Sequence, residues 1–462
     1  MSNTKLQKYF GTDGIRGRVG TYPITPDFAL RLAYITGRVL SKHLLSKESN
    51  SKLAVIIGKD TRLSGYLFES SLEAGFCYSG IDVYMAGVLP TPAISYLTKS
   101  LNLLAGVVIS ASHNPYTDNG IKFFDNSGNK LDDVIEAEIE ACMHDELIAS
   151  DVLGRVYRLD EGINNYINFC KNTFSKLKNP THNYSLNNLK IVLDCANGAT
   201  YNVAPAVFTQ LGAKVIAIAD KPNGININLE CGSTHPEHLK NAVFEHKADL
   251  GIAFDGDGDR VLIVDNLGNI YNGDKLLYII LKGYLALGHK IQGVVGTVMT
   301  NLALEKQLLI ENIELIRTKV GDRYILQELN RRQWYLGGEQ SGHLLCLDKH
   351  TTGDGIISAL QVLLSMSILK KSLVEIISWS DYPQILINVS LTSDKMAYYN
   401  SPKVQKKINS IISQIMLSLD NNIRIVVRQS GTESVVRVMV EAVTHSIAKK
   451  YANELVEYIT QL

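Results

Sequence analysis

Short runs of β-branched residues alternate with longer helix-period segments through about the first 370 residues of the chain. This alternation predicts α/β units whose strands are mostly buried. In such sheets ligands gather at the carboxyl ends of the strands, so the polar loops that follow the strands are the places to look for chemistry. The predicted strands are residues 53–58, 106–110, 190–194, 250–254, 314–318 and 334–337, and the loops that follow them are residues 59–62, 111–115, 195–198, 255–259, 319–323 and 338–343.

Helix signals fill the gaps between these strands. Thr25, Pro26 and Asp27 supply a cap, a first-turn proline and an acid before an apolar-periodic stretch at residues 28–45. Asp132 and Asp133 open another helix in the same way.

The tail of the chain has a different pattern. It predicts strands at residues 384–391, 423–429 and 435–442 and helices at 404–419 and 445–459, which indicates a small α+β domain with an antiparallel sheet, joined by a linker at 378–383. The fold class is therefore α/β, with three similar mixed α/β domains plus a smaller C-terminal α+β domain. The expected boundaries are 1–156, 157–262, 263–372 and 373–462.

Composition removes several classes of function. The 462 residues carry 46 basic and 46 acidic side chains, so no net charge attracts nucleic acid or anionic lipid. The six cysteines have no metal-ligand spacing, which favours reduced thiols in a cytosol. Neither a signal peptide nor an apolar run of the ~18 residues that a membrane span needs is present, so we expect a cytoplasmic protein without a membrane partner.

An acidic turn between two buried strands is the strongest local signal. Asp255, Asp257 and Asp259 alternate with glycines in this turn, and hard oxygen ligands of this kind suit Mg²⁺. An EF-hand would require Gly where Arg260 stands and Glu where Asn266 stands, and helices where the flanks are strands. A solvated acidic turn is the other alternative, but three like charges between buried strands repel one another without a cation. The turn therefore predicts a metal site.

Ser112 ends another predicted strand, in a loop with His113, Asn114 and Pro115. Alone, this serine could cap the next segment, and His113 could be a hydrogen-bonded structural residue. The residues from Asn119 to Lys122 follow closely and offer a turn and then a cation. A phosphorylated serine needs a cation and a metal to hold its charge, which makes Ser112 a candidate.

Two more polar loops fit phosphate or sugar chemistry. Arg428, Ser430, Gly431 and Thr432 offer a forked donor, hydroxyls and backbone N–H groups for a phosphate dianion, although an ordinary hairpin fits equally well. The loop at 338–343 has a composition suited to sugar hydroxyls, or is simply a polar loop. Residues 59–62 receive no direct role. No nucleotide-binding glycine motif is present, which argues against a kinase or a nicotinamide enzyme.

Together these loops resemble the α-D-phosphohexomutase superfamily, in the same order and over essentially the whole chain. The similar motifs are the phosphoserine loop at 110–115, the metal loop at 255–260, the sugar loop at 338–343 and the phosphate loop at 428–432. The opening at 10–17, the segment at 231–237 and Gln340 resemble the phosphoglucosamine mutase branch. One departure is Ser434, where that branch commonly has proline.

The resemblance implies four domains around a central cleft and an enzyme that converts glucosamine 6-phosphate to glucosamine 1-phosphate, an early step towards UDP-N-acetylglucosamine and the bacterial cell wall. Phospho-Ser112 gives its phosphoryl group to the sugar, forming glucosamine 1,6-bisphosphate as intermediate, and recovers the other phosphate. One Mg²⁺ per chain rests on Ser112, Asp255, Asp257 and Asp259.

The remaining roles implied by the resemblance are positive charge, acid–base chemistry and sugar binding. Arg16, Lys122 and Arg260 supply positive charge, and the general acid or base is among Arg16, His113, Lys122 and His343. The expected substrate-binding residues are Arg260, Glu339, Ser341 and His343.

Some alternatives stay open at this point. The same chemistry could act on mannose or glucose phosphates, and a catalytically silent sugar-phosphate-binding protein would need no phosphoserine. The expected partners are a small sugar phosphate and either a priming kinase or a bisphosphate donor for Ser112. Monomer and homodimer are both compatible with the sequence.

Overall fold

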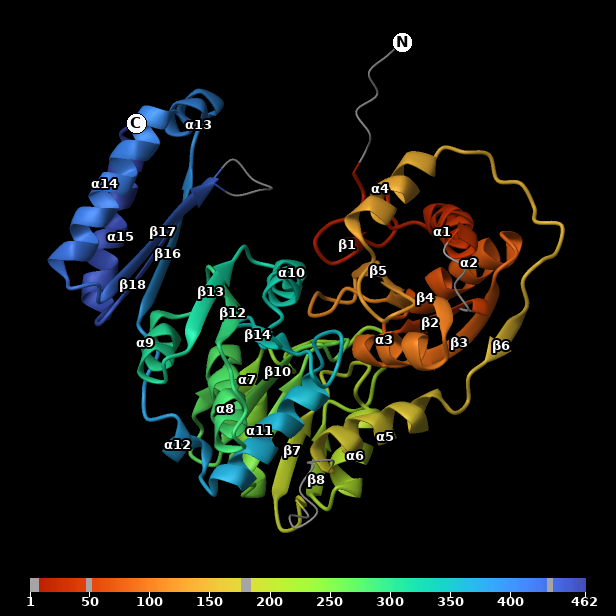
Figure 1. Ribbon diagram of the computed structural model, residues 1–462, viewed down its shortest axis with the longest axis horizontal. Helices are drawn as coiled ribbons and strands as arrows, with labels where there is room; N and C mark the ends of the chain where they lie inside the picture. Colours follow the sequence, from red (N-terminus) through yellow and green to blue (C-terminus); the bar gives the residue numbers. More distant parts are fainter. Residues whose placement is uncertain (1–7, 47–51, 176–183, 430–434) are drawn as a thin grey trace. The chain divides into compact units, whose positions relative to one another are not determined.

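The computed structural model describes residues 8–46, 52–175, 184–429 and 435–462. It consists of two compact units (Figure 1). The first unit comprises Met1–Thr297 and Thr318–Ile376, and the second comprises Val298–Arg317 and Ile377–Leu462. No helix among the described residues is long and apolar enough to cross a membrane.

The first sheet of the first unit has the order β1-β5-β4-β2-β3-β6. β2 pairs in parallel with β3 and β4, whereas β5 runs antiparallel to β4 and β1. Its strands are β1 (Ile15–Arg18), β2 (Lys52–Lys59), β3 (Asp82–Val88), β4 (Leu103–Ile109), β5 (Asp118–Asp125) and β6 (Val156–Arg158), and its helices are α1 (Pro26–Ser46), α2 (Gly65–Tyr78), α3 (Thr91–Ser100) and α4 (Asp133–Cys142).

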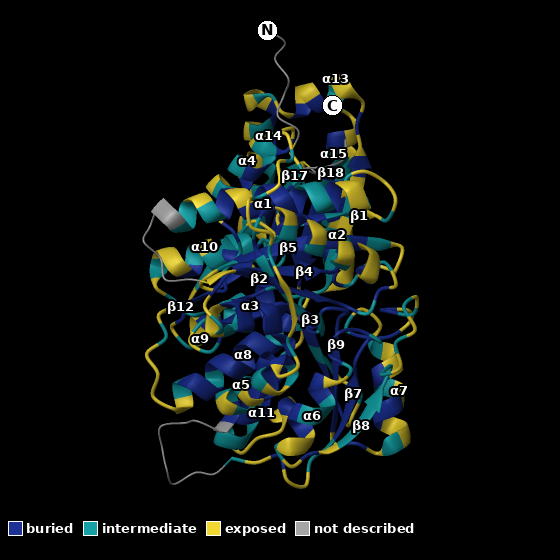
Figure 2. Cartoon of the chain, turned by 90° about the vertical axis from the view of Figure 1, so that its right-hand side faces the viewer, coloured by how far each residue is buried: buried dark blue, intermediate teal, exposed yellow. Residues whose placement is uncertain are grey.

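Both faces of this sheet are covered, because alternate residues of β2 and β4 face opposite helices. Val55, Ile57 and Val107 belong to a core shared with α1 and α2. A β-carbon on Gly58 or Gly106, on the other face, would meet side chains of α3. Figure 2 accordingly shows β2 and β4 mostly in the colour of buried residues. This explains why these strands are continuous apolar runs in the sequence.

The second and third sheets complete the first unit. The second has the order β11-β10-β9-β7-β8, and the third contains β12, β14 and β15 in this unit. The strands are β7 (Lys190–Asp194), β8 (Lys214–Ile218), β9 (Leu250–Phe254), β10 (Val261–Asp265), β11 (Ile270–Tyr271), β12 (Gly293–Thr297), β14 (Leu336–Gly338) and β15 (Leu344–Cys346). The helices are α5 (Gly162–Ser175), α6 (Val203–Gln210), α7 (Pro236–His246), α8 (Gly273–Ala286), α10 (Asp322–Arg332), α11 (Gly355–Leu369) and α12 (Leu373–Ile376).

The second unit is built on a three-stranded antiparallel sheet with the order β16-β18-β17. Apolar side chains of the sheet and of α14 and α15 form one core. Glu441 is fully buried, where its carboxylate accepts from the backbone N of Leu302 at 3.1 Å and pairs with Arg424 at 3.2 Å. The elements are α9 (Leu302–Ile310), β13 (Glu314–Thr318), β16 (Gln384–Ser390), α13 (Ser393–Tyr399), α14 (Pro402–Ser418), β17 (Ile423–Gln429), β18 (Val435–Ala442) and α15 (His445–Thr460).

The predicted fold class is confirmed: mixed α/β sheets with covering helices precede a smaller α+β domain. The predicted helix starts are also confirmed, since α1 begins at Pro26 and Asp132 caps α4 by accepting from the backbone N of Val134. The boundaries at residues 156, 262 and 372 stay predictions. β10 runs across residue 262 and pairs along its length with β9.

One local prediction is wrong. Asn119 and Gly120 do not form a turn, because they lie inside β5. This strand is paired on both sides, with β4 and with β1, and two ladders of backbone hydrogen bonds outweigh the turn preference of an Asn-Gly pair. The cation that follows is correctly predicted, and the β-strand is what aims Lys122 into the site described below.

Candidate active site

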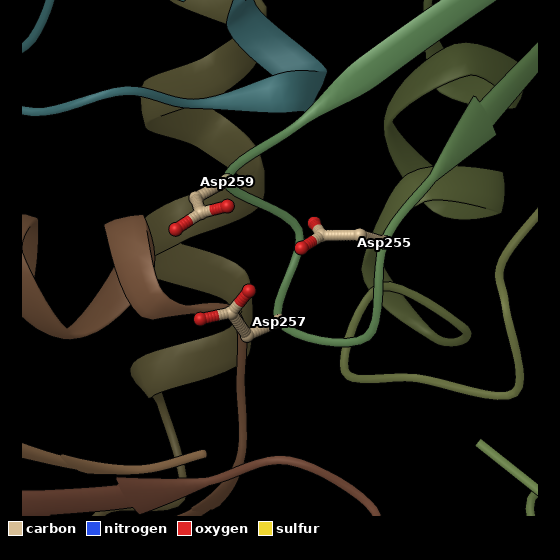
Figure 3. A group of neighbouring side chains, drawn as sticks. All are labelled: Asp255, Asp257 and Asp259. Atoms are coloured by element: carbon tan, nitrogen blue, oxygen red, sulfur yellow. The ribbon is translucent and has the colours of Figure 1, made fainter. Parts of the chain in front are cut away.

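The acidic turn joins β9 to β10 and is closed by backbone bonds. The N–H of Gly258, which has a φ of 75°, donates to the carbonyl of Asp255 at 3.1 Å. Positive φ is readily adopted by glycine, so this residue lets the chain reverse within a few residues. The turn brings the carboxylates of Asp255, Asp257 and Asp259 together, with one oxygen of each lying within 4.8 Å of the others (Figure 3).

This cluster fits a cation. All three aspartates are buried, and the Oδ1 atoms of Asp257 and Asp259 have no hydrogen-bond partner. Buried carboxylate oxygens without partners are costly, whereas a hard divalent cation satisfies several of them at once. The other oxygen of Asp257 accepts from Thr91 Oγ1 at 2.7 Å. The sequence could not single out Thr91, which comes from the start of α3.

The electrostatics of the turn show the same need for positive charge. Burial, together with the carboxylates of Asp259 and Asp257, raises the pKa of Asp255 well above its usual range. Burial would raise the pKa of Asp259 too, but Lys122 and His343 hold it below the usual value. Two neighbouring carboxylates in one turn are thus pushed in opposite directions. A divalent cation would stabilise the ionised form of both.

Lys122 is the cation next to this turn. Its ammonium is buried and lies 2.8 Å from Asp257, 3.1 Å from Asp13 and 3.5 Å from Asp259. Burial alone would lower the pKa of Lys122, but these carboxylates raise it above its usual value. Arg16 pairs with Asp13 on the same side of the turn. Both predicted cations of the first domain are therefore brought to the acidic turn.

Ser112 faces the turn from the loop between β4 and β5. Its hydroxyl is buried and donates to Asp255 Oδ2 at 2.5 Å, which places the predicted nucleophile against the predicted metal ligands. His113 Nδ1 lies 3.4 Å from the same hydroxyl. Burial and the positive charges of Arg260 and Arg16 lower the pKa of His113 to about 4, so its imidazole is neutral at pH 7.

A ring of alternating charges surrounds the turn and links elements of all three sheets. It brings in Asp13, Lys130 and Asp322, which the sequence did not single out as site residues. Lys130 Nζ lies 2.6 Å from Asp13 and 2.5 Å from Asp322. The ring continues from Asp322 to His343 Nε2 at 3.4 Å, from His343 Nδ1 to Asp259 at 3.7 Å, and from Asp259 through Lys122 back to Asp13.

The predicted sugar loop lies beside this ring. The backbones of His343 and Arg260 form a β-bridge, which fixes the loop against the acidic turn. Burial by itself would lower the pKa of His343, but Asp259 and Asp322 raise it to about 9. Glu339 is half-buried and its Oε1 accepts from the N–H of Gly321 at 3.0 Å, whereas Ser341 is exposed. Neither makes a printed side-chain contact with the aspartate cluster, and the sugar-binding role of the loop stays a prediction.

Residues 59–62, to which the sequence assigned no direct role, contact the serine loop. Arg62 is fully buried and its Nη2 donates to the carbonyl of Ser112 at 3.0 Å. Asn228, from the segment between β8 and α7, donates to the same carbonyl at 2.9 Å. The strand-end position of residues 59–62 was a usable signal for Arg62, whereas nothing in the local sequence marks Asn228.

The predicted phosphate loop belongs to the second unit. Arg428 is half-buried in β17, opposite Arg437 of β18. Ser430, Gly431, Thr432 and Ser434 lie outside the described residues. The phosphate-binding role of this loop stays a prediction.

Comparison with sequence families matches nearly the whole chain. Four models of phosphoglucomutase/phosphomannomutase match in order: alpha/beta/alpha domain I at residues 7–148, domain II at 164–268, domain III at 272–382 and the C-terminal domain at 386–458.

Curated relatives and solved structures agree with this match. A phosphoglucosamine mutase from Neisseria subflava is 51% identical over 98% of this chain and 99% of its own, and one from Cupriavidus metallidurans is 52% identical over 97% and 98%. A phosphoglucomutase/phosphomannomutase family protein from Burkholderia thailandensis has a similar fold, with a TM-score of 0.78 at 20% identity over 100% of this chain and 98% of that one. The Aspergillus fumigatus N-acetylphosphoglucosamine mutase, solved with GlcNAc-6P and magnesium, has a TM-score of 0.63 at 18% identity over 98% and 95%.

Proposed function

Because this chain belongs to the phosphoglucomutase/phosphomannomutase family, with phosphoglucosamine mutases about half identical to it over nearly its whole length, we propose that it interconverts glucosamine 6-phosphate and glucosamine 1-phosphate. The chain is then an isomerase that moves a phosphoryl group within one sugar. A phosphorylated Ser112 and a glucosamine 1,6-bisphosphate intermediate carry the reaction.

The observation that carries this proposal is the contact between Ser112 Oγ and Asp255, inside a cluster of three buried carboxylates flanked by Lys122 and Arg16. A protein that only binds sugar phosphates has no need for a buried serine against such a cluster. A phosphoryl donor does need it, because phosphoryl transfer depends on positioning and on neutralising charge. Mg²⁺, bound by Asp255, Asp257, Asp259 and the phosphorylated serine, would supply the largest share of that neutralisation.

The proposed reaction has two symmetric transfers. In the first, the bond between Ser112 Oγ and phosphorus breaks as the free sugar hydroxyl forms its own bond to phosphorus. The hydroxyl proton leaves to a side chain of the site, and Ser112 Oγ regains a proton. The bisphosphate then turns around and returns its other phosphoryl group to Ser112, so the enzyme is again phosphorylated and the sugar is isomerised.

Proton exchange falls to the side chains around Ser112 and the acidic turn. His113 has a nitrogen 3.4 Å from Ser112 Oγ, Lys122 and His343 reach Asp259, and Arg16 pairs with Asp13. We keep all four as candidates for the general acid or base. Positive charge on Lys122, Arg16 and Arg260 also stabilises the charge of the transferring group.

We assign the non-transferred phosphate to the loop that follows Arg428. Arg428→Ala is expected to raise the KM for glucosamine 6-phosphate and to lower turnover, because a forked cation on a dianion contributes about 1.5–3 kcal/mol, or roughly 10- to 150-fold in kcat/KM. Steady-state kinetics with both sugar phosphates measure this. Arg428→Lys is the matched control, which keeps the charge and loses the fork, and it should lie between the two. An unchanged KM in Arg428→Ala would place the phosphate elsewhere.

Selectivity for the C2 amine tests the proposed substrate. We expect kcat/KM for glucosamine 6-phosphate to exceed that for glucose 6-phosphate and mannose 6-phosphate by roughly 5- to 150-fold, corresponding to about 1–3 kcal/mol of differential binding in the transition state. Each assay contains the matching 1,6-bisphosphate, so that priming of Ser112 is not limiting. A higher value for glucose or mannose phosphate would reassign the substrate and leave the phosphoserine chemistry standing.

A further inference from the structure

Ser112 is held in a conformation that a serine does not adopt freely. Its φ is 54°, in the left-handed region. For a residue with a β-carbon this region is unfavourable by about 1–3 kcal/mol and persists only where the surroundings enforce it. The conformation determines where Oγ points, and Oγ lies 2.5 Å from Asp255 Oδ2. The groups that hold the Ser112 backbone therefore also decide the position of the nucleophile.

Two side chains hold this backbone through its carbonyl groups. Arg62 Nη2 donates to the carbonyls of Ser112 at 3.0 Å and Asn114 at 2.8 Å. Asn228 Nδ2 donates to the same two carbonyls, at 2.9 Å and 3.1 Å. The other guanidinium nitrogen of Arg62, Nη1, donates to the carbonyls of Pro115 and Asp118. The whole loop from β4 to β5 is thus fastened by one guanidinium and one amide.

The guanidinium of Arg62 is itself fixed. Arg62 has no exposed surface, and its Nε donates to Asp60 Oδ2 at 2.8 Å. Asp60 also accepts from Ser110 Oγ at 2.6 Å, and Ser110 Oγ in turn accepts from the N–H of Ser112 at 2.9 Å. The peptide groups on both sides of the Ser112 α-carbon are therefore held from β2.

Asn228 holds the loop from the domain of the second sheet. It is 7% exposed, and its own N–H donates to the carbonyl of Ala196 at 2.9 Å. Five residues later the N–H of Ser233 donates to the carbonyl of Phe254 at 2.8 Å, directly before Asp255. The segment from Asn228 to Ser233 thus connects the serine loop to the strand that carries the acidic turn.

The packing at this junction leaves no room for adjustment. A β-carbon on Gly256 would lie 2.6 Å from the carbonyl oxygen of Ser112 and 2.8 Å from Asn228 Nδ2. The acidic turn, the serine loop and the Asn228 amide therefore pack against one another at the point where glycine allows close approach.

We propose that Arg62 and Asn228 are positioning residues that hold the strained turn of Ser112, and that Asn228 sets the register of the nucleophile against the acidic turn across the boundary between the first two domains. This role deepens the proposed phosphoserine mechanism and rests on it. Neither side chain touches the sugar loop or the aspartate carboxylates through a printed contact. Their loss should therefore slow the transfer step and leave sugar binding unchanged.

The decisive variant is Asn228→Asp. Aspartate keeps the shape and tolerates the φ of 58° at this position, but it presents an oxygen to two carbonyl oxygens in place of a donor. Misplacing a reacting group by a fraction of an ångström to 1 Å lowers rates by up to about 10²-fold, so we expect kcat to fall roughly 10- to 100-fold while KM for glucosamine 6-phosphate stays within about twofold. Asn228→Ala removes the donor without adding charge and should fall in the same direction.

A single-turnover measurement separates positioning from general damage to the fold. Dephosphorylated enzyme is mixed with glucose 1,6-bisphosphate, and the gain of one phosphoryl group is followed by intact mass. In this step a sugar O–P bond breaks, the Ser112 Oγ–P bond forms, and the hydroxyl proton passes to the leaving sugar oxygen. The rate should fall in the Asn228 variants by the same factor as kcat, and in Arg62→Lys, which keeps the pair with Asp60 but loses the forked donor.

Asn226→Asp is the matched control. It makes the same amide-to-acid change two residues away, where Asn226 bonds only to Asn223 and Lys221 within its own segment in the printed contacts, and its rate should stay within about twofold of wild type. Phosphorylation rates in both Asn228 variants within twofold of wild type would overturn the positioning role, as would a rise in KM with an unchanged phosphorylation rate. Failure of the proposed function would look different: wild-type enzyme would take the phosphoryl group and yet not turn over glucosamine 6-phosphate.

Discussion

Ser112→Ala is expected to abolish mutase activity while leaving the protein folded. The proposed route requires a covalent phosphoryl carrier, and removal of such a nucleophile lowers turnover by a factor on the order of 10⁴ or more. The fold should survive because alanine keeps the β-carbon and only one hydrogen bond, from Oγ to Asp255, is lost. Turnover of glucosamine 6-phosphate and the thermal unfolding midpoint are measured together, and the midpoint should shift by only a few degrees.

The control for this variant is Ser127→Ala, an exposed serine in the turn that follows β5 of the same domain. It should keep full activity and take up one phosphoryl group from a bisphosphate donor, whereas Ser112→Ala should take up none. Activity of Ser112→Ala within a few-fold of wild type would refute the phosphoserine mechanism. Phosphorylation that persists in this variant would place the carrier on another residue.

Removal of divalent metal is expected to stop turnover, and added Mg²⁺ to restore it. Asp257→Asn should lower kcat by roughly 10²- to 10³-fold, the range seen when one electrostatic group is taken from a transition state. It should also raise the Mg²⁺ concentration needed for half-maximal rate, since the site loses one of three carboxylates. The physical reason is that the buried Oδ1 of Asp257 has no hydrogen-bond partner and is free to ligate a cation.

A readout independent of activity accompanies this variant. Mg²⁺ should raise the thermal unfolding midpoint of the wild-type protein, because a ligand that binds only the folded state stabilises it, and this increase should shrink in Asp257→Asn. Asp160→Asn, an exposed acid between β6 and α5, should behave as wild type in both measurements. Full activity of metal-depleted enzyme would make the acidic turn a structural feature held by Lys122 alone.

The sequence predicted the parts of the site that are encoded within single loops. Asp255, Asp257 and Asp259 are three carboxylates on alternate residues, and no tertiary information is needed to see that such a turn must meet a cation. The strands on both sides were equally visible, because β9 is buried on both faces and reads as an uninterrupted apolar run. The contact between the serine loop and this turn followed from a general property of α/β sheets, whose strand ends carry the ligands.

Residues that act from a distance could not be predicted. Asn228 lies 116 positions from Ser112, in a segment with no regular periodicity, and its amide has meaning only where two domains meet. Lys130 joins Asp13 and Asp322, which come from opposite ends of the first unit. The false turn at Asn119 has the same origin, since local preference was overruled by pairing with two neighbouring strands.

The sequence by itself thus determined the α/β class, the order of the motif-bearing loops and the chemistry of the acidic turn, because each depends on residues within a few positions of one another. The tertiary structure decided which groups meet: it set Ser112 Oγ at 2.5 Å from Asp255, buried Lys122 among three carboxylates and fastened the serine loop with Arg62 and Asn228. These contacts span more than a hundred residues in several cases. They depend on how whole sheets pack together, which no local pattern along the chain records.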